Sequence, residues 1–144
     1  MNKTLISSIL ILAIIFILSI GNSFAQTIPG LSVKTNKKSY KPGSSGVITI
    51  KFKTGTGIKI PKEPPIDVNI SGDGISGDGL QDYSGGDGDY IDSKTIKYNF
   101  TVSGDAESDT SIKISGSVKF GYCSSESGVC KIGTKNFSVT IKVQ

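Results

Sequence analysis

Two cysteines, Cys123 and Cys130, are the residues of this chain whose type and spacing could support chemistry. The sequence contains neither histidine nor arginine. Without histidine, a chain cannot build a Ser-His-Asp or Cys-His nucleophile or a His-containing zinc site. Two thiols are also too few for a zinc site or an iron–sulfur cluster. Carboxylate chemistry, calcium binding and thiol redox chemistry remain, and the last of these needs no metal and no cofactor.

The first 25 residues have the layout of a secretory signal peptide. A charged start at Lys3 precedes the apolar run 5–20 and the small-residue exit Ser23-Phe24-Ala25. The apolar run is shorter than the roughly 20 residues that comfortably span a bilayer, so an uncleaved membrane anchor is the less favoured alternative. We therefore predict a signal peptide over 1–25, a periplasmic or secreted location, and no stable membrane span after cleavage.

The remaining residues, 26–144, fit one domain with one core. Residues 1–25 carry one of the 16 lysines and no acid, which leaves 15 lysines against 12 acids and a net charge of +3. This surplus is too small and too scattered to suggest nucleic acid as a partner.

Apolar and polar residues alternate with a period of two along most of the mature chain, a pattern typical of half-buried strands. The alternating runs cover positions 31–33, 48–52, 66–70, 96–102, 112–120 and 137–143. No segment shows a sustained helical period. Several short strands separated by turn residues predict an all-β fold, an antiparallel β-sandwich of immunoglobulin-like shape. The chain has no Trp, and its cysteines are too close in sequence for the inter-sheet disulfide of a true immunoglobulin domain.

The segment 71–92, SGDGISGDGLQDYSGGDGDYID, concentrates six aspartates among glycines and serines. Clustered carboxylates on a flexible backbone suit calcium. Their order, however, fits neither the EF-hand loop nor a calcium-binding nonapeptide repeat. Gly and Asp also supply the backbone angles of ordinary turns. Solvated loops between strands are therefore the favoured interpretation, and calcium binding is the alternative.

The structural interpretation of the cysteine pair is a staple that closes a surface loop near a strand pair. Cys123 follows the alternating run 112–120, and Cys130 comes after the polar link 124–129. Closing a loop of about eight residues stabilises a fold by roughly 2.5 kcal/mol. Disulfides of small exported domains are usually structural. On composition and spacing alone, the staple is favoured over a redox role.

The residues around the cysteines also form a segment that is similar to one found in a known protein family. The stretch 118–130, VKFGYCSSESGVC, is followed by the closing strand 136–143, while SYKPG at 39–43 and KEPP at 62–65 each precede a strand. In this order the motifs resemble the N-terminal periplasmic domain of DsbD-type thiol:disulfide interchange proteins, here in a stand-alone form. The likeness covers most of the mature chain.

The resemblance implies that Cys123 and Cys130 cycle between dithiol and disulfide. It implies electron transfer between a membrane or thioredoxin-like donor and periplasmic partner proteins, through a mixed disulfide that the second cysteine resolves. It also implies a cap loop over the pair, with Tyr83 as the candidate shield and Asp82 as a candidate proton handler. Tyr122, beside Cys123, is a candidate for partner docking, although ordinary core packing is the favoured interpretation.

Several features depart from the family pattern. The link between the cysteines is longer than in the better-known members. The residues 131–133, KIG, stand where many members have an aromatic residue and prolines, and 57–60, GIKI, replace a tyrosine-rich segment. The sequence carries neither the membrane domain nor the thioredoxin-like domain of those proteins. A non-catalytic immunoglobulin-like binding or structural module with a loop-stabilising disulfide is therefore the alternative function.

Overall fold

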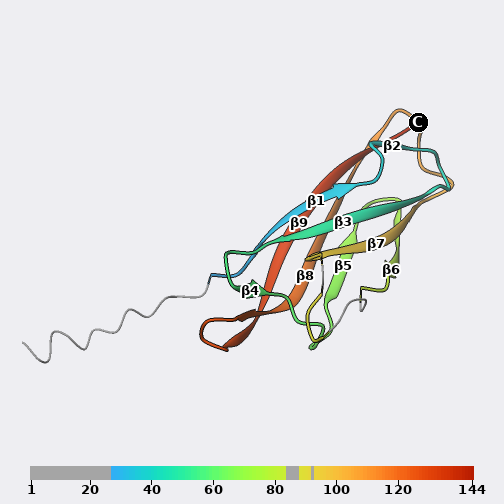
Figure 1. The fold of residues 1–144 in the computed structure, drawn as a ribbon. Helices are drawn as coiled ribbons and strands as arrows, with labels where there is room; N and C mark the ends of the chain where they lie inside the picture. Colours follow the sequence, from blue (N-terminus) through green and yellow to red (C-terminus); the bar gives the residue numbers. More distant parts are fainter. Residues whose placement is uncertain (1–26, 84–87, 92) are drawn as a thin grey trace, which may run out of the picture.

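The protein is a β-sandwich whose two sheets pack face to face (Figure 1). The computed structural model describes residues 27–83, 88–91 and 93–144, and the predicted signal peptide therefore lies outside the described residues. The described residues contain strands and turns and no helix. In particular, they include no helix that is long and apolar enough to cross a membrane.

Sheet A contains four strands in the order β1-β3-β7-β6. These strands are β1 Gly30–Thr35, β3 Ser45–Lys53, β7 Thr95–Val102 and β6 Ile75–Leu80. All three pairings within this sheet are antiparallel.

Sheet B is built around the long antiparallel pair β8 and β9. Its order is β2-β9-β8-β4, with β5 also paired to β8, and β2 runs parallel to β9. These strands are β2 Ser39–Tyr40, β9 Cys130–Val143, β8 Ser111–Ser124, β4 Ile58–Lys59 and β5 Asp67–Ser71. The strand order is compatible with the predicted immunoglobulin-like arrangement, which stays a prediction, whereas the all-β sandwich is confirmed.

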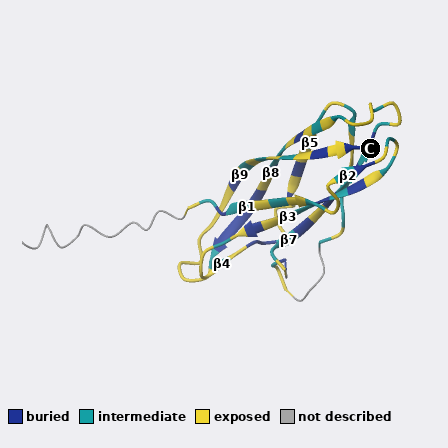
Figure 2. Cartoon of the chain, turned by 90° about the horizontal axis from the view of Figure 1, so that it is seen from above, coloured by how far each residue is buried: buried dark blue, intermediate teal, exposed yellow. Residues whose placement is uncertain are grey.

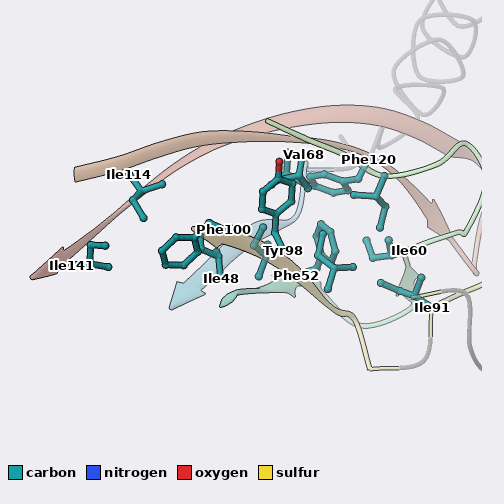
Figure 3. Packing of buried hydrophobic residues seen from close by; sticks show 14 of the residues in the cluster. Ile48, Phe52, Ile60, Val68, Ile91, Tyr98, Phe100, Ile114, Phe120 and Ile141 are labelled. Atoms are coloured by element: carbon teal, nitrogen blue, oxygen red, sulfur yellow. The ribbon is translucent and has the colours of Figure 1, made fainter. Parts of the chain in front are cut away.

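The core lies between the sheets because alternate residues of each strand point inward. Figure 2 shows buried and exposed residues alternating along the strands, and Figure 3 shows the inward side chains of both sheets meeting. Phe52 of β3 packs against Phe120 of β8, with ring centroids 4.7 Å apart. Phe120 in turn lies 6.2 Å from Tyr122. The alternating runs predicted from the sequence are therefore the strands that supply the core.

Two elements differ from the expectation. The Gly- and Asp-rich segment was expected to form loops, but residues Ile75–Leu80 form the edge strand β6, with an irregularity between Gly77 and Gly79. β9 begins at Cys130, well before the predicted run at 137. A turn leads from β2 into β3, in which Ser44 N–H donates to Lys41 O over 3.1 Å and Gly43 has a φ of 75°.

Candidate functional site: the Cys123–Cys130 pair

Cys123 and Cys130 form a disulfide between two neighbouring strands. Cys123 lies near the end of β8, and Cys130 is the first residue of β9. The two residues are directly opposite each other in the β8–β9 register. Their Cα atoms are 4.0 Å apart and the S–S distance is 2.01 Å. The disulfide therefore links the two strands of one hairpin, close to its turn.

The turn of this hairpin holds the cysteines in place. Ser124 N–H donates to Val129 O over 2.9 Å, and Gly128 N–H donates to Ser124 O over 2.9 Å. Gly128 has a φ of 68°, a backbone conformation that glycine adopts without steric cost. The polar link between the cysteines is thus an ordered turn. Its backbone geometry places the two cysteines opposite each other.

The disulfide lies on the outer face of sheet B. Phe120 and Tyr122 point into the core, and successive residues of a strand point to opposite faces. Gly121 and Cys123 therefore point outward, together with their partners Ile132 and Cys130. A side chain built at Gly121 would meet the ring of Pro61 at 2.9 Å, so the segment that contains Pro61 covers this part of the outer face.

The two cysteines differ in exposure. Cys123 is 4% exposed, whereas Cys130 belongs to the exposed residues of the hairpin end. The large apolar residues on either side of Cys130 are also exposed, Val129 by 47% and Ile132 by 58%. One side of the disulfide is consequently accessible from solvent and has apolar neighbours, while the other is enclosed by the protein.

Strand β4 borders the disulfide on the β8 side. Lys59 is opposite Cys123 and Ile58 is opposite Ser124. The backbone N–H and the hydroxyl of Ser125 both donate to Gly57 O, over 2.8 Å and 2.9 Å. The Lys59 Nζ lies over the Tyr90 ring, 5.0 Å from its centroid. The segment 57–60, singled out in the sequence, is thus the direct neighbour of Cys123.

Tyr122 and Lys131 are opposite each other on the core-facing side of the hairpin. Tyr122 is 2% exposed and belongs to the core cluster. Its position supports the favoured interpretation of core packing, because a buried ring presents no surface to a partner. Lys131 is exposed next to Cys130.

The two cap-loop candidates, Asp82 and Tyr83, lie directly after β6. Asp82 is exposed, and Tyr83 is partly buried against the core. The Tyr83 hydroxyl accepts a hydrogen bond from Ile66 N–H over 2.8 Å. The next residue, Asp67, is opposite Lys119, four positions before Cys123 on β8. The hydroxyl of Tyr83 is thus held at the start of β5, and its role as a shield for the disulfide stays a prediction.

The described aspartates of segment 71–92 lie at separate places, with Asp73 before β6, Asp78 on it, Asp82 after it and Asp89 next to Tyr90. Asp78 lies on β6 and accepts a hydrogen bond from the Thr101 hydroxyl over 2.8 Å. Asp87 and Asp92 lie outside the described residues. Within the described part of the chain, no three Asp, Glu or Cys side chains gather in a group that could hold a metal ion.

Sequence reasoning missed the exposed apolar side chains of Val129 and Ile132. The first part of β9, which carries Ile132, lacks the alternating pattern of a strand, because its inward positions 131, 133 and 135 are Lys, Gly and Lys. The signal that could have found it is the turn at Gly128, because a hairpin that closes there continues β9 back to Cys130.

Comparison with known protein families and curated proteins identifies no relative of this chain. No protein-family model matches the sequence, and no curated protein matches it.

Proposed function

We propose that this chain is an exported thiol:disulfide exchange domain that acts through the Cys123–Cys130 pair. It passes electrons between a membrane or thioredoxin-like donor and periplasmic partner proteins. The observation that carries the proposal is the unequal exposure of the two cysteines, with Cys130 exposed and Cys123 buried beside it. The likeness of the cysteine segment to DsbD-type domains supports the same function.

The exposed sulfur determines the order of the exchange. A donor thiolate attacks Sγ of Cys130, the Cys130–Cys123 bond breaks, and Cys123 leaves as a thiolate that takes up a proton. The donor's second thiolate then attacks the donor sulfur in the mixed disulfide and releases Cys130. The donor is oxidised by two electrons, and this domain holds two thiols.

Delivery of the electrons uses the same sulfur in reverse. The Cys130 thiolate attacks a partner disulfide and forms a mixed disulfide, and one partner sulfur leaves as a thiolate that takes up a proton. Cys123, as a thiolate, then attacks Sγ of Cys130 and releases the second partner thiol. β8 and β9 pair along Ser111–Tyr122 as well as at the cysteines, and we expect this long backbone pairing to keep Cys123 opposite Cys130 for the second step.

One lysine beside the pair supports the thiolate form that exchange requires. Lys59 of β4 is directly opposite Cys123, so its side chain leaves the sheet on the same face as the disulfide. A nearby cation stabilises a thiolate relative to a neutral thiol.

The test is the reduction potential of the pair, measured by equilibrating the exported protein in dithiothreitol and glutathione redox buffers. The proposal expects a value within the range of disulfide exchange proteins, from about −120 to −270 mV. A value below about −300 mV is typical of structural disulfides and would overturn the proposal.

The second candidate is a non-catalytic module in which the same disulfide stabilises the hairpin. The burial of Cys123 favours it, because an enclosed sulfur is protected from reduction. If this candidate holds, the Cys123→Ser, Cys130→Ser double variant unfolds at lower denaturant concentration and keeps its partner binding. A mixed disulfide trapped between Cys123→Ser and thioredoxin would count against it.

A further inference from the structure

Four exposed lysines gather on the outer face of sheet A. Lys34 of β1 and Lys97 of β7 are both opposite Thr49 of β3, so the three residues form one row across the sheet. Lys51 belongs to the next row along β3, and Lys53 to the row after that. The register thus places four ammonium groups on one half of this face.

The strands that form this half of the face carry no compensating charge. Strands β1, β3 and β7 contain no Asp or Glu. Among the described residues, none is hydrogen-bonded or ion-paired to the ammonium group of Lys34, Lys51, Lys53 or Lys97, whose backbone groups take part in the sheet. The acid of the neighbouring strand, Asp78, is bound to the Thr101 hydroxyl at the opposite end of β7 from Lys97.

The lysines of sheet B are arranged differently. Lys119 of β8 is directly opposite Asp67 of β5. Lys113 is opposite Thr140 and Lys142 is opposite Ser111, so these two lysines occupy neighbouring rows at the other end of the hairpin. Both sheets therefore have lysines on their outer faces, but among the described strands the larger group is the four lysines of β1, β3 and β7, strands that contain no Asp or Glu.

The lysines of sheet A are close enough for their electrostatic potentials to add. Neighbouring strands lie about 4.8 Å apart and alternate residues of one strand about 6.6 Å apart. These separations are comparable to or below the Debye length of about 8 Å at physiological salt. Like charges at this distance repel one another, so the cluster disfavours the isolated fold and favours contact with an extended anionic surface.

We propose that this basic face of sheet A, formed by Lys34, Lys51, Lys53 and Lys97, binds the surface of an anionic phospholipid bilayer. A sheet face presents its lysines in one layer, which fits a planar array of phosphates. The position of the apolar run 5–20 supports a bilayer as the partner. Nine residues separate Ile20 from Gly30, the residue opposite Lys53.

An extended chain of nine residues spans at most about 30 Å. While the apolar run is in the membrane during export, the basic face is therefore held close to the lipid surface. The face is also near the disulfide end of the sandwich, because the four residues 54–57 connect β3 to β4, the strand opposite Cys123 (Figure 1). Membrane binding is independent of the redox function and would stand without it.

The test is co-sedimentation of the exported protein, free of residues 1–25, with vesicles. Vesicles of equal parts phosphatidylglycerol and phosphatidylcholine are compared with vesicles of phosphatidylcholine alone. Each lysine near an anionic membrane contributes about fivefold to binding. We expect the variant Lys34→Gln, Lys51→Gln, Lys53→Gln, Lys97→Gln to bind the anionic vesicles more than about tenfold less tightly.

Two matched variants control for charge and folding. Four Lys→Gln substitutions, at Lys113, Lys119 and Lys142 of sheet B and at the exposed Lys41, which directly follows β2, remove the same charge and are expected to retain most of the binding. Four Lys→Arg substitutions on the basic face keep the charge and should also retain it. Thermal melts followed by circular dichroism check that each variant is folded.

Several results would overturn the proposal. One is equal binding of the wild-type protein to anionic and neutral vesicles, or to neither. Another is an equal loss in the sheet A and sheet B glutamine variants, which would indicate a response to net charge alone. Binding to a soluble polyanion such as heparin without binding to the anionic vesicles would assign the face to a different partner.

Discussion

At the scale of single residues, the disulfide has an enclosed side and an accessible side. Two neighbours in one strand ladder usually share similar surroundings, but here β4 and the segment with Pro61 border only the β8 side. The sequence predicts that the two cysteines are close enough to pair, because they are seven positions apart and the link between them is polar. It does not predict which sulfur is accessible, because that depends on residues 57–61, which are far away in the chain.

The first prediction concerns the reactivity of the two thiols. In the Cys123→Ser variant, the remaining thiol of Cys130 is exposed and should react quickly with Ellman's reagent. In the Cys130→Ser variant, the thiol of Cys123 is enclosed and should react at least about tenfold more slowly, since access controls thiol reactivity. Equal rates would contradict the assignment of Cys130 as the attacked sulfur.

The second prediction concerns the carboxyl group of Asp105. The hydrogen bond from the Ser103 hydroxyl to the carboxylate holds the pKa of Asp105 below its ordinary value of 3.8. A lowered pKa in the folded state stabilises the fold above the ordinary value, and this contribution is lost as the pH falls through the lowered pKa. The Ser103→Ala variant should raise the pKa of Asp105 in a carboxyl NMR titration, whereas Ser44→Ala should leave it unchanged.

At the scale of elements, the sequence predicts the strands in which apolar and polar residues alternate. It does not predict the strands that lack this alternation. β3, β7 and β8 place Ile, Val, Phe or Tyr at most of every second position, because these positions face the other sheet. β6 has glycines at positions 77 and 79, so its sequence shows no clear alternation. Its backbone pairing with β7 holds it in the sheet. Long-range pairing of this kind is not visible in a local pattern.

A third prediction concerns the contact between β3 and the core at Gly46. A Cβ atom at this position would lie 2.3 Å from Phe100 and 2.6 Å from Tyr40, and both rings are fully enclosed. Gly46→Ala should therefore lower the free energy of unfolding by about 1–3 kcal/mol. Gly55→Ala, where no atom lies within 4 Å of the new Cβ, is the control in urea denaturation, and an equal effect of both would contradict the packing argument.

A fourth prediction concerns the link between Tyr83 and β5. Tyr83→Phe removes the acceptor for Ile66 N–H, and Ile66 is 4% exposed. An unsatisfied buried donor costs about 1–3 kcal/mol, so the melting temperature should fall. Tyr90→Phe keeps the ring that faces Lys59 and should change stability by less than about 0.5 kcal/mol. No change in the Tyr83→Phe variant would show that water replaces the hydroxyl.

At the scale of the whole molecule, the two sheets close one core that does not include the disulfide. The inward residues come from both sheets, and the cysteines lie on the outer face of sheet B. The sandwich class follows from the sequence because the number and spacing of the alternating runs leave few other ways to bury them. The distribution of charge over the two outer faces of the sandwich cannot be predicted from the sequence in this way, because that distribution depends on the strand order.

The fifth prediction follows from this separation of core and disulfide. The Cys123→Ser, Cys130→Ser double variant should unfold cooperatively, with a free energy of unfolding lower by about 2.5 kcal/mol. Its far-UV circular dichroism should match that of the oxidised protein. Loss of the cooperative transition would show that the fold depends on the disulfide.

The β8–β9 hairpin also has a consequence for how the chain folds. Five residues separate the ends of these strands, so the chain closes this loop at a small entropic cost. Strands β1, β5 and β6 reach their partners only through longer or non-sequential connections. The cysteines therefore come together in the most local strand pairing of the sandwich, and their oxidation can precede the assembly of the two sheets.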